Sequence, residues 1–151
     1  MATIALGSDH AGYDLKREVI SHLEQAGVKY KDFGCFEGEK CDYPVIAEQV
    51  CEKVVAQEYK YGILICGTGI GISMAANKMK GIRAAVCTDY YSAKYTRLHN
   101  DANILCLGGR VIGGGVAAEI VDVFLSTEFE GGRHANRVSL IMDIEKNQEG
   151  K

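Results

Sequence analysis

The stretch Tyr61-Gly62-Ile63-Leu64-Ile65-Cys66-Gly67-Thr68-Gly69-Ile70-Gly71-Ile72-Ser73 decides the fold class. It contains an uninterrupted apolar run, 63–66, which is typical of a strand buried on both faces. Three glycines at alternate positions follow, and 72–78 has the pattern of a helix. Glycines let an anionic ligand approach the peptide N–H groups, and a helix N-terminus adds unpaired donors. We therefore expect a strand, an anion-binding turn and a helix, with Cys66 at the carboxyl end of the strand, where a reactive thiolate is favoured.

Spacing excludes three better-known motifs at this turn. A P-loop needs Gly-Lys-Ser/Thr at 72–74, and the residues there are Ile72, Ser73 and Met74, with no lysine. The dinucleotide fingerprint lacks its third glycine, because position 72 is Ile, although Asp89 lies about twenty residues on, where that fingerprint has an acidic residue. A cysteine phosphatase loop would need Arg at the same position. A buried structural cysteine beside a tight turn remains the alternative to a reactive one, because free cysteines are often buried.

Apolar runs and helical patterns alternate along the whole chain. The pattern predicts strands and helices in turn, and the second strand is the least apolar, which favours a sheet edge. Alternation of this kind implies right-handed βαβ units. The sequence therefore predicts an α/β protein with one domain, 1–151: a Rossmann-like three-layer sandwich in which helices flank a five-stranded parallel sheet. Strands are expected at 3–7, 28–33, 63–66, 82–87 and 104–107, and helices at 13–26, 44–55, 72–78, 92–98, 116–125 and about 136–146.

Composition limits the location and partners of the protein. A net charge of −3 gives no reason to expect binding to nucleic acid or to an anionic membrane. No apolar stretch approaches the roughly 20 residues of a membrane span, and the start lacks the basic region of a signal peptide. The six cysteines form no C-x-x-C pair and no zinc spacing, which favours a cytoplasmic protein with reduced thiols and no metal site. They stand at positions 35, 41, 51, 66, 87 and 106.

Polar residues follow several of the predicted strands. In parallel sheets, ligands bind beyond the carboxyl ends of the strands. We therefore expect four groups to gather at one edge of the sheet: Asp9-His10, 66–71, Asp89 and 108–110. Asp9 has the alternative role of capping the helix that follows it.

Two further polar groups stand outside these strand ends. His99-Asn100-Asp101 follows a predicted helix, where a histidine can also simply complement the helix dipole. Arg133 and Arg137 are four residues apart, so on a helix they share a face and could hold a phosphate together. A solvated basic turn is the alternative for this second group.

These motifs together resemble the type B ribose-5-phosphate isomerases, part of a wider family of sugar-phosphate isomerases that includes those of galactose 6-phosphate metabolism. The match runs in order over almost the whole chain, and the cysteine turn with Gly-Gly-Arg-His is its most specific part. The matching segments are 9–10, 42–44, 66–73, 75–78, 81–84, 99–101 and 131–134.

The resemblance implies a metal-independent aldose–ketose isomerase of the pentose phosphate pathway that needs no cofactor. It interconverts D-ribose 5-phosphate and D-ribulose 5-phosphate through an enediolate. Cys66 would move the proton between C1 and C2, and the turn would donate N–H groups to the enediolate, with Thr68 assisting. His99 would open the furanose ring while Asp9 helps to hold the sugar. Position 75 is Ala, so the variant of the family that uses a glutamate base does not fit.

The resemblance also implies a substrate-binding set and an assembly. Asn100 would bind sugar hydroxyls, and Arg133 and Arg137 would hold the phosphate. Relatives form homodimers, often paired into tetramers, with active sites between subunits, so 131–151 is expected to contact a partner. The whole expected set is Asp9, His10, Tyr43, Gly67, Thr68, Gly69, Ile70, Gly71, Asn100, Arg110, Arg133, His134 and Arg137.

Three other functions compete with this interpretation. The first is an isomerase of the same family acting on a six-carbon sugar phosphate of the allose or galactose type. The second is a nucleotide-binding regulatory module, which the missing fingerprint glycine disfavours. The third is a thiol redox protein, which the lack of a C-x-x-C pair disfavours. The sequence leaves open any role of Cys35, Cys41 and Cys51.

Overall fold

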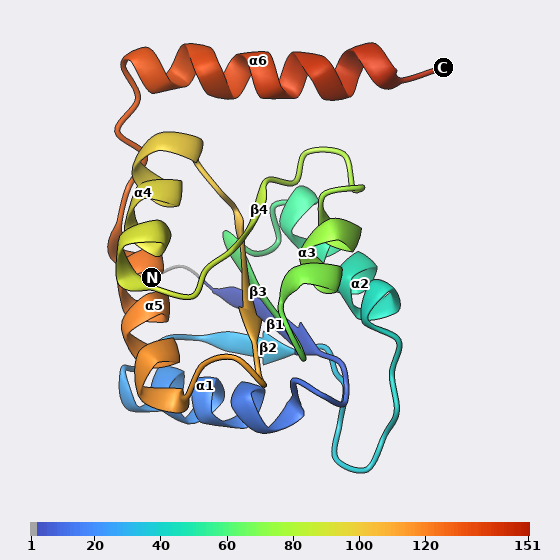
Figure 1. The fold of residues 1–151 in the computed structure, drawn as a ribbon, viewed down its shortest axis with the longest axis vertical. Coiled ribbons are helices and arrows are strands. Elements are labelled where there is room, and N and C mark those ends of the chain that lie inside the picture. Colours follow the sequence, from blue (N-terminus) through green and yellow to red (C-terminus); the bar gives the residue numbers. More distant parts are fainter. Residues whose placement is uncertain (1–2) are drawn as a thin grey trace.

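The computed structural model describes residues 3–151, in which five strands alternate with five helices and a sixth helix ends the chain (Figure 1). Every predicted element is present. The strands are β1 (Ile4–Ser8), β2 (Tyr30–Asp32), β3 (Tyr61–Cys66), β4 (Ala84–Val86) and β5 (Ile104–Gly108). The helices are α1 (Tyr13–Gln25), α2 (Tyr43–Val55), α3 (Ile70–Ala76), α4 (Tyr90–Asn100), α5 (Gly114–Ser126) and α6 (Arg133–Gln148).

The five strands form one sheet in the order β2-β1-β3-β5-β4, and every pairing is parallel. This confirms the predicted α/β fold and places β2 at an edge, as its weaker apolar pattern indicated. The two central strands β1 and β3 pair over five residues, from Ile4 with Tyr61 to Ser8 with Ile65. All carboxyl ends therefore reach the same edge of the sheet.

Helices cover both faces of the sheet and make three layers. Side chains of α1, α4 and α5 fill one core with one face of the sheet, including Leu15, Ala93 and Phe124. Side chains of α2 and α3 fill the other core, including Val50 and Ile72. Because α1 and α3 lie on opposite faces, the loops after β1 and β3 diverge and leave a crevice between them, as at other topological switch points.

Local chemistry explains where several helices begin and end. Gly27 adopts a φ of 70° directly after the C-cap of α1, a conformation that glycine adopts without strain. Pro44 lies in the first turn of α2, where its missing N–H costs nothing. Helix α3 begins at Ile70, two residues earlier than predicted, because Gly69 turns the chain with a φ of 79°.

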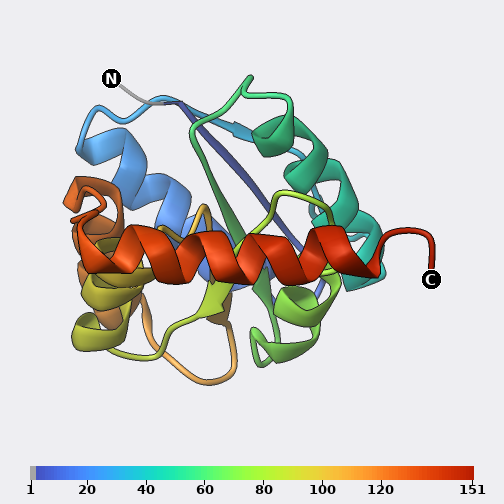
Figure 2. The ribbon, with the colours of Figure 1, turned by 90° about the horizontal axis from the view of Figure 1, so that it is seen from above.

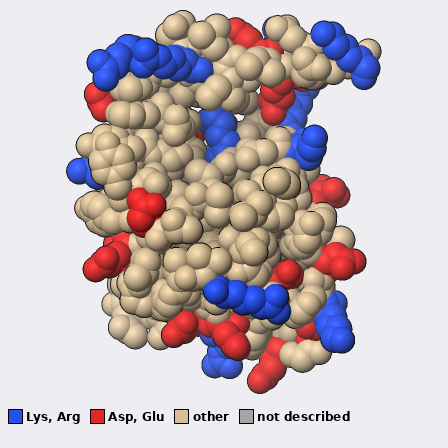
Figure 3. Space-filling view, in the orientation of Figure 1, with Lys and Arg blue, Asp and Glu red and all other residues tan. Residues whose placement is uncertain are grey.

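Helix α6 stands apart from the other layers. It lies across the end of the molecule where the strands begin, beside α4 (Figures 1 and 2). His134 is its only buried residue, whereas Leu140 and Ile144 are exposed. A cavity of about 770 Å³ separates its second half from the body, and Figure 3 shows the hollow beneath it. No helix within residues 3–151 has both the length and the apolar character to cross a membrane.

Candidate active site

A pocket of about 450 Å³ opens at the carboxyl ends of the central strands. Its walls come from the loops after β1, β3 and β5 and from the start of α2, so the predicted gathering of strand-end residues takes place. The lining residues are Asp9, His10, Ala11, Cys41, Asp42, Tyr43, Cys66, Gly67, Thr68, Gly71 and Arg110. Seven of the sequence-predicted site residues, from Asp9 to Arg110, therefore share this pocket with Cys66.

The glycine turn holds the Cys66 sulfur at the base of the pocket. Cys66 ends β3 with a side chain that is almost fully buried, and its Sγ accepts a hydrogen bond from the Gly69 N–H at 3.1 Å. The Ile70 N–H donates to Thr68 Oγ1, also at 3.1 Å. The N–H groups of Gly69 and Ile70 therefore make hydrogen bonds within the turn. Neither residue lines the pocket. Gly67, Thr68 and Gly71 are the members of the turn that face it.

Two glycines of the turn have pocket side chains as neighbours, and the contact is tight at Gly71. A Cβ on Gly71 would lie 2.8 Å from Cζ of Tyr43, whose ring closes one side of the pocket. A Cβ on Gly67 would lie 3.4 Å from a guanidinium nitrogen of Arg110. The absence of these two side chains lets the phenol of Tyr43, at the start of α2, and the guanidinium of Arg110, in the loop after β5, approach the turn.

Asp9 and His10 have different environments although they are adjacent. Asp9 is 7% exposed, and its Oδ1 accepts a hydrogen bond from the Gly12 N–H at 2.9 Å, just before α1. Asp9 therefore stabilises the turn that leads into α1, and it also borders the pocket. His10 is exposed, and its Nδ1 lies 3.4 Å from the Cys41 N–H. A ring nitrogen that accepts this bond carries no hydrogen, so Nε2–H is left as a donor.

Asp89 follows β4 but does not line the pocket. It is the N-cap of α4, and its carboxylate accepts hydrogen bonds from the Ser92 N–H and from Ser92 Oγ. These two bonds, backbone first, lower the pKa of Asp89 below its ordinary value. Asp89 therefore stands at the expected edge of the sheet, but its side chain is committed to the helix and takes no part in this pocket.

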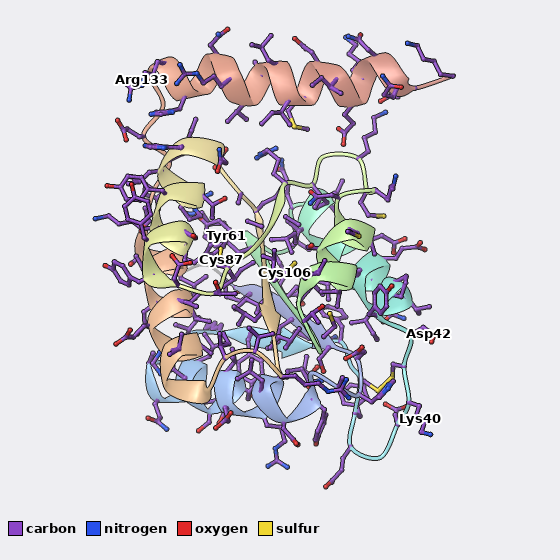
Figure 4. All side chains as sticks on the ribbon, viewed as in Figure 1. Lys40, Asp42, Tyr61, Cys87, Cys106 and Arg133 are labelled. Carbon is purple, nitrogen blue, oxygen red and sulfur yellow. A yellow bond between two sulfur atoms is a disulfide. The ribbon has the colours of Figure 1, made fainter. Side chains whose placement is uncertain are left out.

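The remaining predicted residues form a second cluster where α4 ends and α6 begins. The rings of His99 and His134 stack with centroids 3.9 Å apart, and His99 Nε2 lies 3.8 Å from the Glu130 carboxylate. Asn100 borders the cavity beneath α6, and Arg133 and Arg137 are exposed. Figure 4 shows Arg133 at one end of the molecule and Asp42, on the pocket wall, toward the other. Within one chain, this cluster and Cys66 lie apart.

Burial makes His134 a neutral side chain in this cluster. Its Nε2 has no hydrogen-bond partner among the described residues. Loss of hydration, followed by the positive charges of His99 and Arg133, lowers the pKa of His134. Arg133 and Arg137 therefore supply the positive charge of this region, and His134 can accept or donate a hydrogen bond.

Two groups of side chains have the residue types that metals prefer, but their geometry does not suit an ion. Ligand atoms of His99, Glu130 and His134 lie within 4.8 Å of one another, but the two rings are nearly parallel, at 10°. The lone pairs of parallel rings lie in separate planes and do not converge on one tetrahedral ion. In the second group, Cys35 and Cys41 are bonded to each other.

The Cys35–Cys41 disulfide corrects the expectation that all six cysteines are reduced. The two Cα atoms are 5.9 Å apart, within the range that a disulfide spans. The described chain leaves four free thiols, all buried: Cys51, Cys66, Cys87 and Cys106. Burial raises the pKa of Cys51 and of Cys87 to about 12. Cys66 is the only free thiol of these four that borders a pocket wall described here.

Sequence reasoning missed Cys41 and Asp42 as pocket residues. Asp42 belongs to the matching segment 42–44, from which only Tyr43 is in the expected site set, and the position of both residues directly before a helix start is the available signal. The long loop that carries them gave no periodic pattern from which its path could be predicted.

Comparisons with known proteins agree with this geometry. The Ribose/Galactose Isomerase family model matches residues 4–141. Ribose-5-phosphate isomerase B of Escherichia coli (strain K12) is 51% identical over 146 residues, 97% of this chain and 98% of that protein. A putative sugar phosphate isomerase of Bacillus subtilis (strain 168) is 51% identical over 144 residues, with coverages of 95% and 97%. The structure of Clostridium thermocellum ribose-5-phosphate isomerase B matches with a TM-score of 0.93 and 54% identity, over 96% of this chain and 98% of that one.

Proposed function

The chain belongs to the ribose/galactose isomerase family, and on that premise we propose that it interconverts D-ribose 5-phosphate and D-ribulose 5-phosphate by proton transfer at Cys66. The resemblance that its motifs indicated is confirmed over nearly the whole chain. The observation that supports the mechanism is the position of the Cys66 sulfur, which lies in a pocket beside a turn of peptide N–H groups.

The proposed reaction uses the Cys66 sulfur as the base and peptide N–H groups of the turn to stabilise negative charge. The Cys66 thiolate removes the C2 proton of open-chain ribose 5-phosphate, and the electron pair moves to the carbonyl oxygen to give an enediolate. The hydrogen on O2 then moves to O1, and return of the first proton from the thiol to C1 gives ribulose 5-phosphate, with a hydroxyl at C1 and the carbonyl at C2. Peptide N–H groups at Gly67, Thr68 and Gly71 stabilise the charge that develops on oxygen, at little reorganisation cost. A well-placed base typically contributes about 10²–10⁴-fold to the rate.

The second cluster is proposed to complete the site of a partner subunit. In this arrangement His99 opens the furanose ring, Asn100 binds sugar hydroxyls, and Arg133 with Arg137 holds the phosphate. The support is spatial, because these residues lie apart from Cys66 in one chain, and α6 carries an exposed apolar side. The protein then acts as a homodimer or homotetramer in which each domain, 1–151, contributes the end of α4, with His99 and Asn100, and its segment 131–151 to a neighbour.

The proposed chemistry needs no metal and no cofactor, since a thiolate and peptide N–H groups supply the base and the charge stabilisation. The proposed partner is a small sugar phosphate, which His10 and Arg110 in the pocket and the arginines of α6 can bind through its negative charge. We place this enzyme in the cytoplasm, where phosphorylated sugars are interconverted.

The test compares two variants in two assays. Purified protein receives five- and six-carbon aldose phosphates, ketose formation is measured, and exchange of the C1 proton of ribulose 5-phosphate with solvent is followed by NMR. Cys66→Ala should lower kcat by at least about 10²-fold and abolish the exchange. His99→Asn should lower turnover of ribose 5-phosphate but spare the exchange, because ribulose 5-phosphate needs no furanose opening.

Retention of more than about a tenth of kcat by Cys66→Ala would contradict the role of the thiol, since a general base contributes at least about 10²-fold. Equal loss of both signals in His99→Asn would contradict the separate role in ring opening. Faster turnover of a six-carbon substrate would assign the alternative specificity within the same family.

A further inference from the structure

The loop between β2 and α2, residues 33–42, is closed by the Cys35–Cys41 disulfide and reaches the active-site pocket. Cys41 lines that pocket together with Cys66. Asp42 and Tyr43, which directly follow it, form the N-cap and first residue of α2 and line the same pocket. A displacement of Cys41 would therefore also move the pocket wall that Asp42 and Tyr43 form.

The Cys35 end of this loop is fixed to the body of the protein. Its N–H donates to the Ser8 carbonyl at 2.6 Å, and the Ser8 N–H donates to the Gly34 carbonyl at the same distance. The Cys35 carbonyl accepts a hydrogen bond from Nζ of Lys16, a fully buried lysine that also pairs with Asp32 at 2.9 Å. Cys35 is thus an immobile anchor at the carboxyl end of β1.

The Cys41 end has few hydrogen bonds, although its side chain is partly buried against the core that α2 helps to form. Its backbone N–H donates to His10 Nδ1 at 3.4 Å, a long bond to an exposed side chain. Between the two cysteines, Glu39 only closes a local turn, through Phe36. The disulfide is therefore the covalent link between the end of the loop with few hydrogen bonds and the anchored end, and it restrains the Cys41 backbone beside His10.

We infer that the Cys35–Cys41 disulfide is a positioning element for His10 in the substrate pocket, so that opening the disulfide weakens sugar-phosphate binding. The inference rests on the proposed function for its kinetic readout. With the disulfide closed, the Cys41 N–H occupies Nδ1, and Nε2–H stays available as a donor to an anionic substrate. With it open, residues 36–41 gain conformational freedom and this bond is lost for part of the time.

The redox step needs an external partner, and a small dithiol supplies it. Dithiothreitol gives two electrons and two protons to the disulfide, which becomes two thiols, while the reagent becomes its cyclic disulfide. Reoxidation by oxidised glutathione closes the bond again: one cysteine thiolate displaces a first glutathione thiol to form a mixed disulfide, and the other cysteine displaces the second, so that two reduced glutathione molecules leave. The buried thiols of Cys51 and Cys87 react slowly in this thiol–disulfide exchange, because a pKa of about 12 leaves almost no thiolate at neutral pH.

The kinetic experiment compares oxidised protein, dithiothreitol-reduced protein and the Cys35→Ser/Cys41→Ser double variant. Alkylation and mass spectrometry count the free thiols in each sample. Reduction should raise KM for ribose 5-phosphate about threefold to tenfold, as loss of one hydrogen bond does, with kcat within about twofold. The double variant should have the raised KM with or without reductant. Reoxidation should restore the low KM of the wild-type protein.

Two control variants test whether the change in KM on reduction arises from the Cys35–Cys41 disulfide and acts through His10. Cys87→Ala should keep the full redox response, since this thiol lies in the core away from the pocket. His10→Asn should raise KM and remove the response, because the disulfide acts through His10. Thermal melts by circular dichroism confirm that each variant is folded.

A second readout does not depend on activity. The ¹⁵N shifts of the His10 ring report which nitrogen carries the hydrogen, and the Nε2–H form should become less populated on reduction. His22, whose Nε2 lies 2.7 Å from Asp122, is the internal control and should not change. An unchanged His10 tautomer, an unchanged KM in active reduced protein, or six free thiols in air-oxidised protein would each overturn the inference. Absence of isomerisation in every sample would instead refute the proposed function.

Discussion

Gly71, in the cysteine turn, faces Tyr43 at the start of α2, and it offers a test of the pocket wall. Gly71→Ala places a Cβ 2.8 Å from Cζ and 2.9 Å from Cε1 of Tyr43. The ring is 39% exposed, so it can swing aside without unfolding the protein. Displacement of this wall should raise KM by at least about threefold, as loss of one substrate contact does, and steady-state kinetics will measure it.

Gly115 provides the matched control for this substitution. A Cβ there meets no atom within 4 Å, and the residue lies in the first turn of α5. Gly115→Ala should leave KM unchanged and stabilise the fold by up to about 1 kcal/mol, because alanine loses less backbone entropy in a helix. A normal KM in Gly71→Ala would show that Tyr43 does not shape the substrate site.

At the scale of one element, α4 depends on its cap at Asp89. Asp89→Ala removes the acceptor for the Ser92 N–H, so thermal melts at pH 7 should show a Tm lower by a few degrees. The folded-state pKa of Asp89 is lowered, so its stabilisation is complete above the unfolded pKa of about 3.9 and declines as the pH falls through the folded value. The Tm difference from wild type should therefore shrink below about pH 4.

The control for this cap is another exposed aspartate on a helix. Asp143→Ala, on α6, should leave Tm at pH 7 almost unchanged, because this residue does not stand at a helix N-terminus. A Tm difference for Asp89→Ala that stayed constant down to pH 2 would show that the carboxylate charge is not the stabilising feature.

For the whole molecule, the distance between Cys66 and α6 predicts sites shared by two chains. Arg137→Ala should raise KM for the phosphorylated sugar by one to two orders of magnitude, since each charge-assisted bond to phosphate contributes about 1.5–3 kcal/mol. Lys146→Ala, an exposed basic residue on the same helix, is the control and should have wild-type KM.

Mixing experiments test the sharing directly. Cys66→Ala protein and Arg137→Ala protein are each impaired, but a hybrid dimer contains one site with both residues intact. Their mixture should therefore regain partial activity at low substrate concentration. If mass spectrometry confirms subunit exchange and no activity returns, the phosphate is held by the chain that supplies the cysteine.

The sequence by itself determined the fold class and much of the catalytic edge. Alternating apolar runs and helical stripes are local patterns, and they predicted every strand and helix to within a few residues. The parallel order then required the strand ends to share one edge, which placed Asp9, Cys66 and Arg110 together before any contact was known. Element ends were less accurate, as α3 shows, because one glycine conformation at position 69 moved its start.

Only the tertiary structure decided which of the polar residues meet. Asp89 stands at a strand end, but its own helix uses its carboxylate, and nothing in a residue type distinguishes these roles. Cys35 and Cys41 pair, and Cys41 reaches His10, because β1, β2 and α2 pack side by side and fold the intervening loop over the pocket. The separation of Arg133 from Asp42, which lines the same pocket as Cys66, is likewise set by the path of the chain after α5. Local patterns specify elements, whereas distances between loops depend on how all the elements pack.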